Sequence, residues 1–293
     1  MTPSTPELRQ ALECTLGRIE NIERSESPYS STYPIEELKV LLGNGSVLQV
    51  IFKNLSRQPR GSSVKPSFLY NPLREIETYR SILSARSLGT ARYFHAVTGQ
   101  DRYWLFLESV AGAPLWQSGD LETWRKAARW LAGLHSERAS VPHLLCYDRD
   151  FYARWWQRAT ALHPKLLPIQ SKYEQAVEYL LELPITFLHG EFYPSNVLVD
   201  GDRICPIDWE MAACGPAMMD LAALTAGKWD EQERLDFMAA YCGTNPSEAM
   251  WHDLECCRLH LAVRWLGWAT DWRPPVAQAH DWQREALQVA EGL

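Results

Sequence analysis

The sequence predicts an α+β protein with two lobes, a small β-rich lobe followed by a larger α-helical lobe. Five β-like runs fall within the first 110 residues, whereas helical periodicity dominates from residue 120 onward. Gly112 and Pro114 interrupt the pattern between these two parts. We therefore expect an N-terminal lobe over 1–107, a C-terminal lobe over 108–293 and a hinge at about 107–114.

The β-rich half begins with a helix start at Thr5, where a hydroxyl residue precedes a proline in the first helical turn. An Asn-Gly turn at 43–45 predicts a hairpin between two of the strands that follow. Residues 71–83 have apolar side chains at helical spacing, which predicts a helix within this lobe. The predicted strands cover 16–24, 35–42, 46–53, 92–97 and 102–110.

The second half is read mainly as helices with polar caps and amphipathic spacing. Among them lies one β segment, a short strand ending at His189 and a hairpin that turns at 200–202. The predicted helices cover 120–138, 148–163, 171–183, 230–242, about 246–272, and a last stretch after Pro275.

Composition and charge limit the class of protein. Net charge is −7, with 46% hydrophobic and 22% charged residues, which is ordinary for a globular chain and disfavours a nucleic-acid partner. Seven cysteines without a C-x-x-C pair indicate a reduced chain with no zinc site, and the first residues lack a signal-peptide pattern. Arg264 interrupts the longest apolar run. We expect a cytoplasmic protein with no membrane partner.

The stretch TFLHGEFYPSNVLVDGDRICPIDWE, from residue 186, sets three oxygen-bearing side chains along two apolar runs. Asn196 follows Glu191 by five residues, and Asp208 comes after a hairpin that can return it to the same cleft. Phosphoryl transfer needs cations on the phosphates, oxygen ligands for magnesium and a carboxylate for the acceptor hydroxyl. This spacing is therefore typical of a phosphoryl-transfer site.

These motifs resemble those of the aminoglycoside phosphotransferase and choline kinase family, in which His-Gly-Asp-x-x-x-x-Asn precedes Ile-Asp-Trp/Phe-Glu. The stretches CGPAMMDLAAL (214–224) and LAGLHS (131–136) resemble two further family motifs. The resemblance covers about residues 15–270. It implies a bilobal protein-kinase-like fold and transfer of phosphate to a hydroxyl of a small molecule, with ATP and Mg²⁺.

The resemblance also implies roles for single residues. Glu191 occupies the position of the family's catalytic Asp, and Asn196 and Asp208 match its magnesium ligands. Lys53 matches the lysine that contacts the nucleotide phosphates. Glu75 matches the helix acid that pairs with this lysine, and its register with Tyr79 independently favours it over Glu77. His189 and Asp220 match residues that brace the loop. The backbone of 107–112, including Leu107, Glu108 and Val110, matches the adenine-binding linker.

The sequence departs from the family pattern at two places. The loop expected over the phosphates, SESPYSST, lacks glycine, so we expect Ser30, Ser31 and Thr32 to supply N–H groups and hydroxyls instead. Glu191 replaces the usual catalytic Asp and reaches about 1.5 Å further, a displacement large enough to matter for rate. Either the acceptor hydroxyl lies correspondingly further back, or the activity has been lost.

Two alternatives to a small-molecule kinase stay open at this point. A nucleotide-binding pseudokinase with a regulatory role would retain the nucleotide residues without turnover. A protein kinase is disfavoured, because Asp208 precedes Trp-Glu rather than Phe-Gly and no Ala-Pro-Glu segment follows. We favour the enzyme and expect an aminoglycoside-like compound, a sugar or an amino alcohol as acceptor. Nucleotide preference and oligomeric state are not predicted.

Tryptophans near the C-terminus suggest a second feature. Trp265, Trp268 and Trp272 are spaced to share one helix face, which could stack on a sugar or hold a cation. Aromatic stripes are more often packed core, and we favour that interpretation. We likewise expect His135 and His189 to be structural histidines, and the sequence shows no partner for His260.

Overall fold

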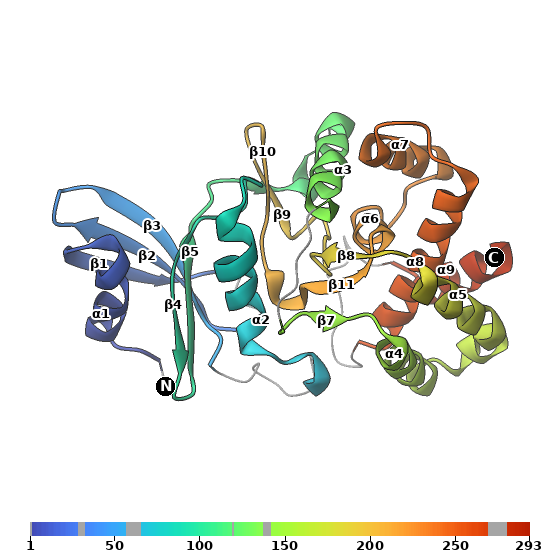
Figure 1. Cartoon of the computed structure of the whole chain (residues 1–293), viewed down its shortest axis with the longest axis horizontal. Coiled ribbons are helices and arrows are strands. Elements are labelled where there is room, and N and C mark those ends of the chain that lie inside the picture. The colour runs from blue at the N-terminus through green and yellow to red at the C-terminus, as the bar shows by residue number, and fades with distance from the viewer. Residues whose placement is uncertain (1, 29–32, 57–65, 119, 137–141, 269–279) are drawn as a thin grey trace.

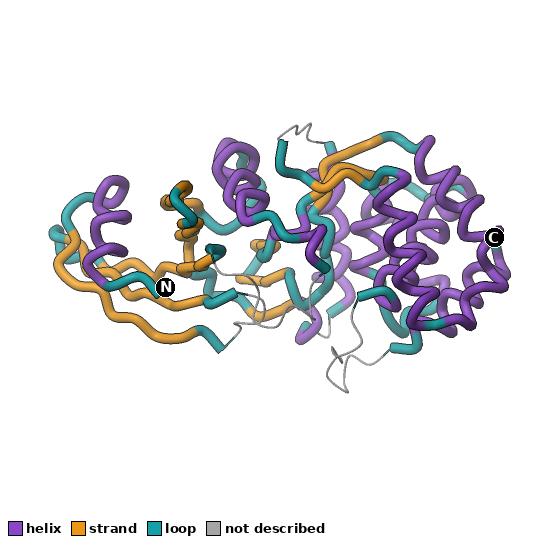
Figure 2. The backbone as a smooth tube through the Cα atoms, turned by 90° about the horizontal axis from the view of Figure 1, so that it is seen from below, coloured by secondary structure: helices purple, strands orange, loops and turns teal. Residues whose placement is uncertain are grey.

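The computed structural model describes residues 2–28, 33–56, 66–118, 120–136, 142–268 and 280–293. A β-sheet region occupies one end of the elongated molecule and a helical region the other, as Figure 1 and Figure 2 show from two directions. The expected α+β class is therefore confirmed. The division into lobes at residue 107 stays a prediction.

The N-terminal region is built on a five-stranded antiparallel sheet of order β1-β2-β3-β5-β4. Four of the five strand predictions are correct to within two residues, and the first is shifted by two to three. The strands are β1 (Ile19–Glu26), β2 (Ile35–Leu42), β3 (Val47–Asn54), β4 (Tyr93–Gly99) and β5 (Arg102–Glu108).

The predicted β2–β3 hairpin is present at 43–45. Leu42 accepts from the Gly45 N–H at 2.9 Å, and Gly45 adopts a φ of 82°, which glycine reaches without a Cβ clash. Helix α1 (Thr5–Leu16) covers one face of the sheet and packs Leu8 and Leu12 into its own apolar cluster. Its cap is Ser4 in a capping box with Glu7, not Thr5 as predicted.

The helix predicted over 71–83 is not a uniform α-helix. Asn71 caps α2 (Pro72–Glu77), the chain then widens into a π-helical turn over Thr78–Ile82, and a 3₁₀ turn ends it at Ala85. Such wide turns are frequent at functional sites. Figure 1 places α2 between the five-stranded sheet and the hairpin of residues 197–206, and α2 contacts both β5 and the turn at Trp209–Met211.

Two small sheets join the sheet region to the helices. β6 (Ala113–Pro114) pairs with β9 (Val197–Asp200), which also pairs with β10 (Arg203–Pro206), while β11 (Ala213–Pro216) lies between β7 (Leu145–Cys146) and β8 (Ile185–Leu188). The segment 109–112 therefore leads directly from β5 to a strand that pairs beside the HGE loop.

The helical region surrounds one buried helix, α8 (Glu248–Leu266), which packs against α4, α5, α6 and α9. The remaining helices are α3 (Leu121–His135), α4 (Arg149–Leu162), α5 (Gln170–Glu182), α6 (Met218–Leu224), α7 (Glu231–Cys242) and α9 (Trp282–Gly292). Within the described residues, none of these helices has the length and apolar character to span a membrane.

The prediction that one helix continues to Trp272 is wrong. α8 ends at Leu266 with Gly267 as its C-cap, and glycine disfavours continuation of a helix because of its backbone freedom. Trp265 stacks on Trp282 and Trp268 on Trp155, so these two tryptophans serve different parts of the helical core rather than one helix face. Trp272 lies outside the described residues.

Candidate functional site

A cleft of about 480 Å³ lies between the five-stranded sheet, the 107–117 segment and the loop that follows β8. Its apolar walls include Ile35, Ile51, Leu107, Leu198 and Ile207, and its polar end holds Lys53, Asn196 and Asp208. An apolar slot with a few convergent polar groups has the character of a small-molecule site. Residues more than 150 positions apart in the chain thus line one space.

Lys53 is the centre of the polar end. Its Nζ lies 2.7 Å from Glu75 Oε1 and 2.7 Å from Asp208 Oδ1, so a strand, a helix and the β10–β11 connection meet at one ammonium group. Glu75 also accepts from the Trp209 N–H at 3.3 Å. The pairing of Lys53 with Glu75, which the resemblance implies and helix register favours over Glu77, is therefore present.

Electrostatics hold the Lys53 ammonium in its charged form. Burial opposes the ammonium, but Asp208 and Glu75 outweigh it and raise the pKa of Lys53 above its ordinary value. Burial raises the pKa of Glu75, because removal from water disfavours its carboxylate. The nearby Asp208 carboxylate adds to this effect, and Lys53 opposes it. Glu75 is the more deeply buried of the two acids. The cluster presents one charged lysine fixed in direction toward the cleft.

Asp208 is held in a left-handed backbone conformation, with φ 65° and ψ 62°. Such a conformation is uncommon for a residue with a Cβ, though Asp tolerates it better than most. Trp209 follows and is fully buried against Phe187 and His189, which fixes the turn. The strained backbone directs the Asp208 carboxylate into the cleft while the next side chain anchors in the core.

Asp220 and His189 hold the HGE loop in place by hydrogen bonds, as the resemblance implies. The Asp220 carboxylate on α6 accepts from the N–H groups of His189 at 2.7 Å and Gly190 at 2.8 Å. His189 accepts from the Glu191 N–H through Nδ1, and its Nε2 lies 2.9 Å from the Ile207 carbonyl. Burial lowers the pKa of His189, so a neutral ring that donates at one nitrogen and accepts at the other fits its partners.

Gly190 is required by the same turn. Its φ is 81°, and a Cβ at this position would lie 2.1 Å from the Met211 carbonyl oxygen. No side chain fits such a gap without moving the backbone. The close approach brings the loop against the segment that carries Asp208, which explains why the two motifs share one cleft.

Glu191 has a partner that the sequence did not reveal. Its Oε1 lies 2.7 Å from Nη2 of Arg264, a residue of α8 that is 2% exposed. Arg264 is the charge that interrupts the apolar run near the C-terminus. The sequence around Arg264 gave no sign of a contact with a loop 73 residues earlier.

Asn196 is oriented by the loop itself. Its Nδ2 donates to the Glu191 carbonyl at 3.1 Å, and its backbone N–H donates to Tyr193 at 2.8 Å. Since the amide nitrogen is directed to the loop, the amide oxygen is the atom available for a cation. Asn196 and Asp208 therefore bring two hard oxygen donors to the same end of the cleft.

This donor set fits magnesium held together with nucleotide phosphates. Magnesium is usually bound by one or two protein oxygens, with phosphates and water completing the octahedron. Among the described residues no cluster of three His, Cys, Asp or Glu side chains is placed to hold a metal alone. A cation that shares its ligands with the phosphates is the arrangement these residues fit.

Some groups of the 107–112 segment line the cleft, and others are already engaged in hydrogen bonds within the protein. Leu107, Glu108 and Val110 all line the cleft, but the Glu108 carboxylate is held by Arg203 at 2.8 Å. The N–H groups of Glu108 and Ser109 donate to Arg92 and Gln49 carbonyls. These two N–H groups are therefore already used within the protein.

Several cleft residues were missed from the sequence. Glu37, Tyr79 and Trp116 line the same space, and Trp116 is 51% exposed at its rim. Strand position alone gives Glu37 no distinguishing signal, whereas an aromatic residue soon after the hinge was a signal available for Trp116. Ser30, Ser31 and Thr32 lie outside the described residues.

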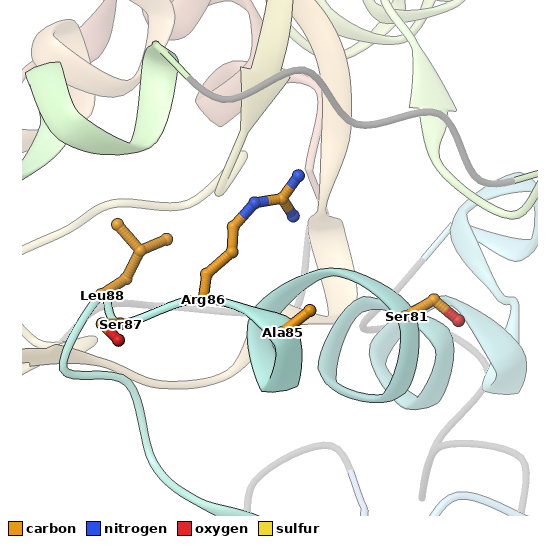
Figure 3. Close-up of a pocket in the computed structure, with 5 residues that line it drawn as sticks. All are labelled: Ser81, Ala85, Arg86, Ser87 and Leu88. Atoms are coloured by element: carbon orange, nitrogen blue, oxygen red, sulfur yellow. The ribbon is translucent and has the colours of Figure 1, made fainter.

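A second, open hollow of about 570 Å³ lies at the end of the π-helical segment. Figure 3 shows its lining by Ser81, Ala85, Arg86, Ser87 and Leu88. Arg86 donates to the Ile82 carbonyl at 3.0 Å, so part of its hydrogen-bonding capacity closes the preceding turn. None of the candidate catalytic residues contributes to this hollow.

Solved structures share this fold at low sequence identity. The choline kinase LicA from Streptococcus pneumoniae has a TM-score of 0.68 and 15% identity, covering 98% of this chain and 99% of that chain. A spectinomycin phosphotransferase, APH(9)-Ia, solved with ADP and spectinomycin, has a TM-score of 0.54 and 13% identity, covering 100% and 95%. At such identities the likeness concerns the fold.

One protein is more similar in sequence than these solved structures, but only over part of the chain. A homoserine kinase from Neisseria meningitidis serogroup B is 32% identical over 137 residues, covering 41% of this chain and 43% of that protein. The chain thus spans less than half the length of this curated relative. The sequence model of the phosphotransferase enzyme family matches residues 69–254, well over half of the chain. The chain belongs to the phosphotransferase enzyme family.

Proposed function

We propose that this protein transfers the terminal phosphoryl group of ATP to a hydroxyl of a small molecule, with magnesium. The observation that carries the proposal is the Lys53 ammonium, fixed 2.7 Å from both Glu75 and Asp208 at the polar end of the cleft. A lysine held in this way is placed for nucleotide phosphates, and Asn196 and Asp208 offer oxygen ligands beside it. Family membership supports the same reaction class.

The nucleotide would lie with its base in the apolar part of the cleft. The Glu108 carbonyl and Val110 are the backbone positions from which base contacts would come. Lys53 would donate to the phosphates, and Asp208 and Asn196 would hold magnesium, which when bound neutralises phosphate charge and orients the terminal group. Trp116, half exposed at the rim, would cover the sugar side of the cleft.

Glu191 would act on the acceptor. It orients the hydroxyl for in-line attack and accepts its proton as the new oxygen–phosphorus bond forms. The bond from the terminal phosphorus to its bridging oxygen breaks in the same step, and the nucleoside diphosphate leaves with the electron pair. Because this transition state is loose, orientation contributes more than early proton removal.

The acceptor is proposed as a small polar alcohol. The proteins named above are kinases for homoserine and choline and a spectinomycin phosphotransferase, and these three compounds share a hydroxyl and a positively charged nitrogen. Acidic residues outnumber basic ones and give the chain a net charge of −7, which suits an acceptor that carries a positive charge. We therefore place amino alcohols, amino acids with a side-chain hydroxyl and aminoglycosides first among candidates.

The experiment is a turnover screen with a binding control. Purified protein, ATP and magnesium are incubated with homoserine, choline, ethanolamine and an aminoglycoside panel, and ADP and phosphorylated product are measured by mass spectrometry. Binding of a fluorescent ATP analogue verifies that the cleft is intact. Phosphorylated product supports the proposal, whereas nucleotide binding without turnover on any hydroxyl compound would favour the pseudokinase alternative.

A further inference from the structure

Arg264 contacts the HGE loop at two consecutive residues. Its Nη2 donates to the Glu191 carboxylate at 2.7 Å and its Nη1 to the Gly190 carbonyl at 2.8 Å. The same Nη1 lies 3.2 Å from the Tyr147 hydroxyl. One buried guanidinium therefore fixes both the backbone before Glu191 and the Glu191 side chain.

The surroundings of Arg264 keep the guanidinium in place. Its carbon lies 6.0 Å from the Trp155 ring centre and 5.9 Å from that of Trp268, which stack on each other. Rigid aromatic walls restrict the planar group, and a planar fork can bond two acceptors at once. The last full turn of α8 is thus a fixed support for the loop.

The length of the Glu191 side chain matches this support. An aspartate carboxylate would be drawn back by roughly one carbon–carbon bond, about 1.5 Å. The 2.7 Å contact to Arg264 would then stretch to about 4 Å, beyond hydrogen-bond range. A glutamate at position 191 and an arginine at position 264 therefore fit each other as a pair.

We propose that Arg264 is the positioning residue for Glu191 and is the reason that this chain works with Glu in place of the usual Asp. The inference rests on the proposed function. Arg264 donates to the Oε1 atom of Glu191, so its role is to fix the direction of the carboxylate. The arginine itself does not touch the reacting atoms.

Arg258 offers a matched control on the same helix. It is also held in ion pairs, with Glu255 at 2.6 Å and Glu285 at 2.9 Å, and its side chain is largely covered, but these acids belong to α8 and α9 rather than to the cleft. Arg258→Gln removes a comparable pair without touching the loop. It separates general destabilisation from loss of Glu191 positioning.

The test compares wild type, Arg264→Gln, Arg264→Lys and Arg258→Gln in kcat, in acceptor KM and in the Kd for an ATP analogue. We expect Arg264→Gln to lower kcat about 100-fold, since misplacement by about 1 Å has effects of this size. The nucleotide Kd should stay within twofold, and Arg258→Gln should match wild type in kcat. Arg264→Lys, which keeps charge but not the fork, should fall between and covers the case in which Arg264→Gln does not fold.

A double-mutant cycle with Glu191→Asp asks whether Arg264 acts through Glu191. In the E191D background the contact to the side chain at 191 is already broken and only the bond to the Gly190 carbonyl remains, so adding Arg264→Gln should change kcat by much less than the about 100-fold expected in the wild-type background. An equal loss in both backgrounds, or an unchanged kcat in Arg264→Gln, would overturn the inference.

A second readout is independent of turnover. Hydrogen exchange at residues 189–196 should increase in Arg264→Gln and not in Arg258→Gln. If wild type phosphorylates none of the acceptors, the proposed function fails, and this exchange comparison still decides the role of Arg264. Unchanged protection of the loop would overturn it.

Discussion

The Lys53 end of the cleft and the neighbouring HGE loop differ in how closely they follow the family pattern. On the proposed phosphate side, Lys53, Glu75 and Asp208 stand where the resemblance places them, and Lys53 contacts both acids. On the proposed acceptor side, Glu191, which is not among the described residues that line the cleft, replaces an aspartate and is held by Arg264 from a distant helix. The difference indicates that a changed residue in the HGE loop can be matched by a partner elsewhere in the chain.

The largest expected effect is on the phosphate side. Asp208→Asn should lower turnover about 1,000-fold, because a bound metal contributes several kcal/mol to charge stabilisation and about 1.4 kcal/mol is tenfold in rate. It should also remove the magnesium dependence of ATP-analogue binding, measured by titration.

Asp202→Asn is the matched control for that change. Asp202 lies in the neighbouring β9–β10 turn, its side chain is 95% exposed, and it pairs with Lys126 at 2.5 Å. It should leave turnover and magnesium dependence as in wild type. If Asp208→Asn and Asp202→Asn behaved alike, the phosphate side would lose its proposed metal ligand.

The close packing between the two sides can be broken at Gly190. Gly190→Ala places a Cβ 2.1 Å from the Met211 carbonyl oxygen in addition to a φ of 81°, so the free energy of unfolding should fall by about 3 kcal/mol or more. Gly45→Ala has a φ of 82° but nothing within 4 Å, and should lose about 1–2 kcal/mol. Urea unfolding measures both, and equal losses would contradict the steric account.

A smaller effect concerns pH and the helix that supports the acceptor side. His260 lies one turn before Arg264 and contacts the Tyr173 hydroxyl at 2.9 Å, and burial holds its pKa well below the ordinary value. The unfolded chain takes up this proton below about pH 6.5 and the folded chain does not, so the stability it contributes is present above that pH and is lost as pH falls.

The measurement for His260 is a difference between wild type and His260→Gln. The stability advantage of wild type should shrink by about 1.4 kcal/mol between pH 7.5 and pH 5.5, because only wild type carries this titration. Taking the difference cancels the other groups, including His189, whose pKa is also lowered. A difference that stays constant over this range would show that His260 titrates normally in the folded chain.

Much of the sheet could be predicted, because alternation and turn residues encode its strands locally. The phosphate side was implied by the resemblance, and helix register added only the preference for Glu75 over Glu77. The end of α8 was misplaced although Gly267, a residue type common at helix ends, is a local signal for it. The Arg264–Glu191 pair was missed because no local pattern links positions 73 residues apart.

Glu191 is proposed to be a working catalytic carboxylate rather than a mark of lost activity. The most direct measurement compares wild type with Glu191→Gln, which keeps side-chain length and an oxygen for Arg264 but cannot take a proton. With the acceptor found in the screen, turnover should fall at least about 100-fold while the Kd for the ATP analogue stays within twofold. Equal turnover in the two proteins would contradict the claim and remove Glu191 from the reaction.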